Sequence, residues 1–161
     1  FAYQLFYRSN IMATKVAVPA MLASGRGGSV IYITSTRAFR AHADDCLYGS
    51  MKAALNRAVE TLALEFAPRG IRVNAVAPGN TWIADDSTPA ELQAQQHRDW
   101  VPAGRPGTAR EVGQLVAYLA SEHAAYITGE VVKIDGGLIL PGVPETFPGM
   151  TPKMHGGGWT P

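Results

Sequence analysis

Two short runs, Ser29-Val-Ile-Tyr-Ile-Thr34-Ser35 and Ile71-Arg-Val-Asn-Ala-Val76, contain the pattern that decides the fold. Both are almost continuously apolar and rich in β-branched residues, which is typical of strands buried on both faces of a parallel sheet. Residues 48–66, which lie between them, carry apolar side chains at every fourth position and are predicted to form a helix. Strand, helix and strand in this order predict a βαβ unit.

The flanking segments extend this alternation in both directions. Residues 1–24 are predicted to form a helix that ends in a glycine-rich turn. Thr108-Ala-Arg-Glu111 is a capping box in front of an apolar helical stripe, and a third strand is predicted over 129–135. Another helix start is predicted at 87–91. The sequence therefore predicts an α/β fold with a parallel sheet.

Composition limits the possible functions of the 161 residues. The formal net charge of +1 argues against nucleic acid or an anionic membrane as a partner. No apolar run approaches the ~20 residues that span a bilayer. With a single cysteine, Cys46, the chain cannot form an intrachain disulfide, and this fits a cytoplasmic protein. We also predict no metal site. We expect 1–140 to form the folded part and the Pro/Gly-rich 141–161 to be an arm or a tail.

The segment from Ser35 to Lys52 holds the candidate chemistry. Tyr48 and Lys52 are four residues apart at the start of a helix, so both side chains share one face. A tyrosine hydroxyl, with an ordinary pKa of about 10, is a poor base at neutral pH, but a neighbouring ammonium favours the phenolate. Ser35 follows a strand, at the edge where α/β sheets place their sites. The three side chains suit proton transfer to or from an alcohol or carbonyl.

Taken alone, the pair Tyr48–Lys52 is also compatible with an exposed pair on a helix surface. The flanking motifs favour the chemical interpretation, because together they resemble the short-chain dehydrogenase/reductase family over residues 10–138. The matching segments are Thr34-Ser35, Tyr48-Gly-Ser-Met-Lys52, Arg72-Val-Asn-Ala-Val-Ala-Pro-Gly79, Ala120-Ser121 and Ile127-Thr-Gly129-Glu-Val-Val-Lys-Ile-Asp135-Gly-Gly137.

This resemblance implies a Rossmann-like, doubly wound parallel sheet, here as its C-terminal part, and NAD or NADP as cofactor. Tyr48 would be the acid/base, Lys52 would favour its phenolate and hold the nicotinamide ribose, and Ser35 would orient the substrate oxygen. The reaction would interconvert a secondary alcohol and a ketone by hydride transfer. The Tyr48–Lys52 spacing is shorter than in the enoyl reductases of the family, which favours this reaction.

The resemblance also implies which residues border the cofactor and the substrate. Pro78 and Gly79 would contact the nicotinamide end of the cofactor, and Thr81 would contact its carboxamide. Trp82 and Ile83 would line the substrate pocket, although Trp82 is also compatible with a place in the core. The family usually carries a threonine where Ile83 stands, and the hydroxyl of Thr81 is a possible substitute.

A second departure concerns a proton-relay asparagine that the family carries in the helix before the first run. Counting back from Pro19 places Phe6 at that position, and Asn10 lies one helical turn later. Either Asn10 takes the role in a shifted register, or the relay asparagine is absent.

Arg37, Arg40 and His42 lie in the loop between Ser35 and Tyr48, where they either contact substrate or are solvated.

The largest departure is that the family's glycine-rich phosphate turn, between a first strand and helix, has no counterpart here. We expect this nucleotide-binding half to precede Phe1. The family also implies a homodimer or homotetramer through the helices at 1–24 and 48–66 and the last strand, and we expect the Pro/Gly-rich tail to cross to a neighbouring subunit. The alternative function is a non-catalytic fragment or degenerate member retained as an oligomerisation chain.

Overall fold

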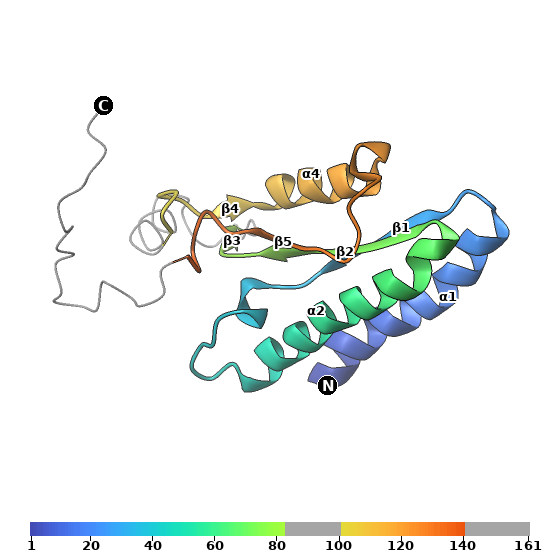
Figure 1. Cartoon of the computed structure of the whole chain (residues 1–161). Helices are drawn as coiled ribbons and strands as arrows, with labels where there is room; N and C mark the ends of the chain where they lie inside the picture. The colour runs from blue at the N-terminus through green and yellow to red at the C-terminus, as the bar shows by residue number, and fades with distance from the viewer. Residues whose placement is uncertain (83–100, 141–161) are drawn as a thin grey trace, which may run out of the picture.

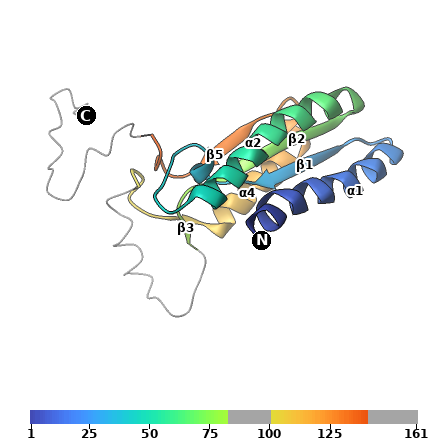
Figure 2. The same ribbon diagram turned by 90° about the horizontal axis from the view of Figure 1, so that it is seen from below.

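A parallel sheet of three strands forms the centre of the structure, a computed structural model that describes residues 1–82 and 101–140 (Figure 1). Helices α1 and α2 cover one face of this sheet, and α4 covers the other (Figures 1 and 2). The sheet order is β1-β2-β5, and a separate parallel pair joins β3 to β4. The elements are η1 (Gln4–Arg8), α1 (Ser9–Ala23), β1 (Gly28–Ile33), η2 (Thr36–Ala38), α2 (Cys46–Phe66), η3 (Ala67–Arg69), β2 (Ile71–Pro78), β3 (Thr81–Trp82), β4 (Gly107–Thr108), α4 (Ala109–Ala120), η4 (Glu122–Ala124) and β5 (Val131–Ile134).

The strand register brings the carboxyl ends of all three strands of this sheet to one edge. Ile33 of β1 lies beside Val76 of β2, and Pro78 of β2 lies beside Ile134 of β5. The backbone N–H of Gly79 donates to the Ile134 carbonyl at 3.0 Å, so the chain leaves β2 next to the end of β5. In a parallel α/β sheet this edge is the usual location of a ligand site.

The core lies on both faces of the sheet, as expected for strands covered by helices on each side. Leu55 of α2 is fully buried on one face and Leu119 of α4 is almost fully buried on the other. Asn74 of β2 is also buried, and both its amide nitrogen and its amide oxygen are hydrogen-bonded. Its Nδ2 donates to the Ile127 carbonyl at 2.8 Å, and its Oδ1 accepts from the Glu130 N–H at 3.0 Å. This side chain fastens the segment before β5 to the middle of the sheet.

The order of helices and strands and the α/β class are confirmed, whereas several predicted boundaries are wrong by a few residues. The predicted helix 1–24 contains a π turn, η1, and α2 begins at Cys46, two residues earlier than expected. The third strand is shorter than 129–135, because Gly129 has a left-handed φ of 84° that strands do not adopt. The helix start predicted at 87–91 and the segment 141–161 lie outside the described residues.

The predicted capping box at the start of α4 is confirmed. The Thr108 Oγ1 accepts from the Glu111 N–H at 3.2 Å, and the Glu111 carboxylate accepts from the Thr108 N–H at 2.8 Å. Arg105 adds two hydrogen bonds to the same carboxylate, at 2.6 and 3.1 Å. Within residues 1–82 and 101–140, no helix is both long and apolar enough to cross a membrane.

Candidate active site

Tyr48 and Lys52 lie one turn apart on the first half of α2, with the Lys52 Nζ atom 5.6 Å from the centroid of the Tyr48 ring. Lys52 is only 9% exposed, and its Nζ donates to the carbonyl oxygen of Ile33 at 2.8 Å. Burial lowers the pKa of the Lys52 ammonium from its ordinary value. Helix α2 therefore holds the Lys52 ammonium in a fixed position beside the Tyr48 ring.

Ser35 lies two residues after the end of β1, next to the strand end that holds Lys52. It is 8% exposed and forms the N-cap of η2, where its Oγ accepts from the Arg37 N–H at 3.1 Å. A serine hydroxyl both accepts and donates, so this bond leaves the Ser35 O–H proton free for another oxygen. The turn thus orients a hydroxyl donor at the ligand edge of the sheet.

The predicted cofactor residues follow β2 at the same edge. Pro78 ends the strand and Gly79 comes next, where a side chain would meet the backbone Cα of Asp135 at 2.8 Å. The Thr81 hydroxyl donates to the Gly79 carbonyl at 3.3 Å and so closes this turn on itself. Trp82 is half-buried in β3. Ile83, predicted to line the substrate pocket, lies outside the described residues.

An aromatic residue of the N-terminal helix completes the surroundings of Tyr48 and Lys52. The Phe6 ring lies edge-on to the Tyr48 ring, with centroids 5.0 Å apart and planes at 87°. The Lys52 Nζ lies 5.7 Å from the Phe6 centroid. Asn10 instead uses its amide within its own helix, donating to the Phe6 carbonyl at 3.2 Å. The structure thus places Phe6 against Tyr48 and Lys52. Phe6 is the residue that counting back from Pro19 puts at the position of the family's relay asparagine, but the sequence alone predicted no role for it.

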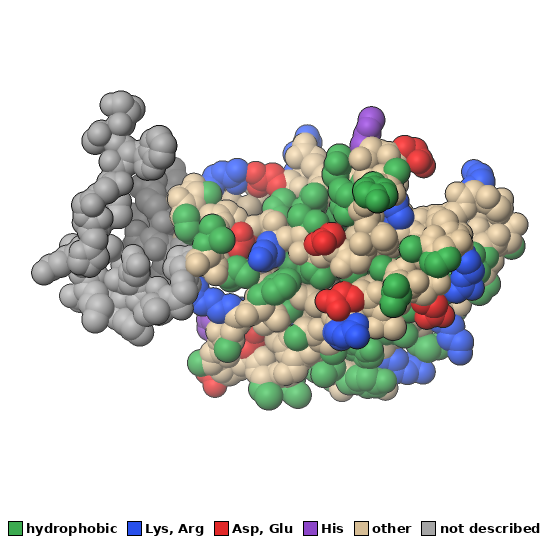
Figure 3. Space-filling model, viewed as in Figure 1, with side chains coloured by type: hydrophobic (Ala, Val, Ile, Leu, Met, Phe, Trp, Pro, Cys, Tyr) green, Lys and Arg blue, Asp and Glu red, His purple; other side chains and the backbone are tan. Residues whose placement is uncertain are grey.

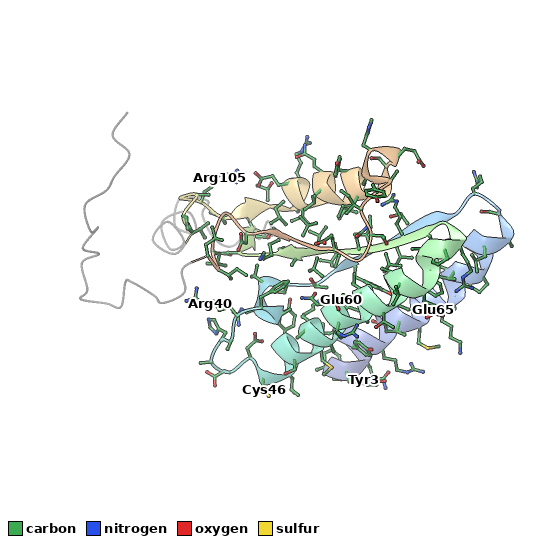
Figure 4. All side chains as sticks on the ribbon, in the orientation of Figure 1. Tyr3, Arg40, Cys46, Glu60, Glu65 and Arg105 are labelled. Atoms are coloured by element: carbon green, nitrogen blue, oxygen red, sulfur yellow. The ribbon has the colours of Figure 1, made fainter. Side chains whose placement is uncertain are left out.

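A pocket of about 290 Å³ lies on another face of α2, between that helix and the loop after β1. Its cationic side chains already have partners in the protein. Arg37 pairs with Asp45 at 3.0 Å, and Arg40 donates to the Leu138 carbonyl at 3.3 Å from the loop position seen in Figure 4. The two arginines therefore hold the loop to α2 and to the end of the sheet. The remaining lining residues are Ala38, Phe39, Ala41, His42, Cys46, Gly49, Ser50 and Ala53.

The donor set suits the ribose and nicotinamide end of a dinucleotide. A lysine ammonium has three N–H groups, and one from Lys52 goes to Ile33, which leaves two for ligand hydroxyls beside the Tyr48 O–H. In the described residues, no glycine-rich turn joins the end of a strand to the start of a helix, which is the arrangement that cradles phosphates. The glycine-rich turn that begins at Gly25 leads into β1, and its Gly27 packs against Gly70. Nor do the described ranges bring three or more His, Cys, Asp or Glu side chains together in a metal-binding cluster.

Comparison with known proteins identifies the family. A family model described as Enoyl-(Acyl carrier protein) reductase, of the short-chain dehydrogenase/reductase type, matches residues 2–139. The chain belongs to the short-chain dehydrogenase/reductase family. The described residues, with Tyr48 and Lys52 on one helix and Ser35 at a strand end, therefore form part of that family's Rossmann-type fold.

Individual short-chain dehydrogenases/reductases match over much of this chain. A 3-oxoacyl-[acyl-carrier-protein] reductase from Aquifex aeolicus is 40% identical over 70% of this chain and 46% of its own length. The crystal structure of acetoin dehydrogenase YohF from Salmonella typhimurium has a TM-score of 0.78 and 32% identity, covering 90% of this chain and 56% of that one.

An NADPH-bound short-chain oxidoreductase from Pseudomonas aeruginosa, described as containing an atypical catalytic center, has a TM-score of 0.79 and 27% identity. That match covers 85% of this chain and 55% of the other. This chain thus spans about half the length of the relatives it matches.

Proposed function

We propose that the protein is an NAD- or NADP-dependent oxidoreductase that interconverts a secondary alcohol and a ketone, with Tyr48 as the acid/base. The position of the Lys52 ammonium carries this proposal. It is bonded to the end of β1 at Ile33 and lies 5.6 Å from the Tyr48 ring centroid. A cation held there favours the phenolate, which is the form of tyrosine that accepts a proton.

Tyr48, Ser35 and Lys52 each have a different role at the substrate oxygen. Tyr48 removes the hydroxyl proton when an alcohol is oxidised and returns it when a ketone is reduced. Ser35 donates its free O–H to the same oxygen and so fixes its direction. Lys52 remains protonated, which favours the Tyr48 phenolate. A nicotinamide cofactor, when bound, supplies or accepts the hydride at the carbon atom.

The chain's own residues support binding of the nicotinamide end of this cofactor. The two free N–H groups of Lys52 and the Tyr48 O–H are directed to ribose hydroxyls in this proposal. Pro78, Gly79 and Thr81 form the neighbouring turn, and in this proposal they would lie against the nicotinamide. The NADPH-bound relative from Pseudomonas aeruginosa supports the same cofactor class.

The names of relatives support a ketone or secondary alcohol as substrate. They include 3-oxoacyl-[acyl-carrier-protein] reductases and acetoin dehydrogenases. The matching family model carries an enoyl-reductase description. The four-residue spacing of Tyr48 and Lys52 is shorter than in the enoyl reductases of the family, so we propose carbonyl rather than alkene reduction.

We further propose that the protein forms a homodimer or homotetramer through α1 and α2. Hydrophobic side chains gather along the lower edge of the molecule, where these helices lie (Figure 3). Val16 of α1 is 75% exposed and Leu64 of α2 is 81% exposed. Exposed apolar side chains on adjacent helices favour a protein interface. A molecular mass in light scattering equal to one chain would contradict this assembly.

Cofactor binding is the decisive experiment. Calorimetric titration with NADH and NADPH should be carried out on this chain and on an N-terminally extended form. We expect the extended form to bind at least one of them, and we expect weaker binding by the present chain, whose described residues contain no phosphate cradle. If the extended form binds neither, the oxidoreductase proposal fails and the non-catalytic alternative gains support.

A further inference from the structure

The Phe6 ring covers Tyr48 and Lys52 from the side of the N-terminal helix. Its centroid lies 5.0 Å from that of Tyr48, with the rings nearly perpendicular, which is a favoured aromatic geometry. The Lys52 Nζ is 5.7 Å from the Phe6 centroid and 5.6 Å from the Tyr48 centroid. The ammonium therefore lies close to two aromatic rings.

Local backbone geometry fixes the position of this ring. Phe6 lies in the middle of the π turn η1, which packs against α2. In a π turn the backbone hydrogen bonds join residues five apart, and here the Ser9 N–H donates to the Gln4 carbonyl. Two side chains of the next turn also donate to carbonyls of η1: the Ser9 Oγ bonds the Leu5 carbonyl at 2.7 Å, and the Asn10 Nδ2 bonds the Phe6 carbonyl at 3.2 Å. Asn10 thus stabilises the turn that presents Phe6.

Three elements pack around the Lys52 ammonium. Phe6 faces it from η1, Tyr48 from α2 and the Ile33 carbonyl from β1. No ion pair of the described residues includes Lys52. Loss of solvation is the cause of its lowered pKa, and an apolar ring is the group that replaces water on the η1 side.

We propose that Phe6 is a positioning residue of the active site: its ring holds the Tyr48 ring edge-on and shields the Lys52 ammonium from water on the η1 side. This inference rests on the proposed function for the roles of Tyr48 and Lys52. It assigns to Phe6 no contact with substrate or cofactor. Proton exchange at Tyr48 then proceeds from its other sides, because an apolar ring offers no proton path.

Titration of the lysines tests the shielding without any turnover. With lysine labelled at Cε by ¹³C, NMR follows Lys52 directly, and the exposed Lys15 and Lys133 serve as internal references. The Phe6→Ala change should raise the pKa of Lys52 toward its ordinary value, whereas Phe6→Leu, which keeps an apolar cover, should leave it near that of the native protein. The matched control is Tyr3→Ala. Tyr3, labelled in Figure 4, lies just before η1 and its ring is exposed, so this change removes an aromatic ring near Phe6 in the sequence.

Steady-state kinetics test the orientation of the Tyr48 ring. We expect Phe6→Ala and Phe6→Leu to lower kcat by roughly two- to tenfold, which is the rate change that corresponds to losing the interaction of one aromatic pair. KM for the substrate should change little. The Phe6→Tyr change, which keeps the ring, should restore kcat. Tyr3→Ala should retain native kcat.

The possible outcomes separate this inference from the proposed function. An unchanged Lys52 titration in folded Phe6→Ala, or native kcat in both Phe6→Ala and Phe6→Leu, would overturn the role of Phe6. If Phe6→Ala does not fold, the contrast of kcat between Phe6→Leu and Phe6→Tyr decides. If the protein has no oxidoreductase activity at all, the Lys52 titration still reports on the shielding.

Discussion

The ammonium nitrogen of Lys52 donates a 2.8 Å hydrogen bond to the carbonyl oxygen of Ile33, the last residue of β1. This bond links the helix that carries Tyr48 to the strand end that leads into Ser35. A backbone carbonyl at the end of a strand is a rigid partner, so the flexible lysine stem is held in one place. The Lys52 side chain therefore joins the elements that carry the three proposed catalytic groups.

Replacing Tyr48 by phenylalanine should lower kcat by about 10²–10⁴-fold, which is the usual contribution of a general acid or base. The ring and its contact with Phe6 remain, so thermal stability should change little. Cofactor binding should weaken by no more than the loss of one neutral hydrogen bond, about 1 kcal/mol. Turnover assays, calorimetry and thermal unfolding measure these three properties. The matched control is Tyr126→Phe, the same change at a fully exposed tyrosine. Native turnover in Tyr48→Phe would remove this residue from the mechanism.

Replacing Lys52 by methionine should weaken cofactor binding by about ten- to hundredfold, because hydrogen bonds from a charged donor are lost. It should also change the pH dependence of folding. Burial lowers the pKa of Lys52, so between that value and the ordinary 10.5 the unfolded chain binds the extra proton and native stability rises with pH.

Lys52→Met should lack this rise. Urea unfolding of both proteins from about pH 7 to about pH 10 measures the difference in slope. Parallel stability curves for the two proteins would contradict the burial of a charged Lys52.

Replacing Gly79 by alanine should disturb the turn that follows β2. The added Cβ would lie 2.6 Å from the Asp135 Cβ and 2.8 Å from its Cα, and overpacking of this kind costs about 1–3 kcal/mol. We expect a lower thermal midpoint and weaker cofactor binding. The Gly113→Ala change is the control, because its Cβ would meet nothing within 4 Å on α4.

A helical glycine-to-alanine change in open space should stabilise by about 0.5–1 kcal/mol. Equal midpoints for the two alanine variants in differential scanning calorimetry would refute the close approach of Gly79 to Asp135.

Acid should weaken the start of α4 through Glu111. The Arg105 guanidinium and the Thr108 N–H and hydroxyl lower the pKa of this carboxyl from 4.5 to about 2. A lowered acidic pKa adds stability that is fully present above the ordinary value and is lost as pH falls through the folded one. Glu111→Gln should therefore flatten the acid dependence of unfolding between about pH 4.5 and about pH 2.

Thermal unfolding followed by circular dichroism across this interval is the measurement. Glu60→Gln is the control, since that carboxylate, labelled on α2 in Figure 4, is exposed and pairs with Arg57 at 3.5 Å. An acid dependence that is unchanged in Glu111→Gln would show that the carboxyl is not held by Arg105 and Thr108.

Much of the fold follows from local patterns along the chain. The apolar runs before Ser35 and after Gly70 determine β1 and β2, and the capping box at Thr108 determines where α4 starts. Each signal involves residues within one or two turns of each other, so a linear sequence contains it in full. Boundaries that depend on a backbone angle, such as the left-handed Gly129, were missed.

The sequence by itself determined that Tyr48 and Lys52 share one helix face, because four residues make about one helical turn. Only the tertiary structure decided what surrounds them. Lys52 meets Ile33 across 19 positions of the chain, and Phe6 reaches Tyr48 across a longer separation still. Such contacts depend on the rotation and crossing of packed helices, which a π turn in η1 alters and no local pattern encodes.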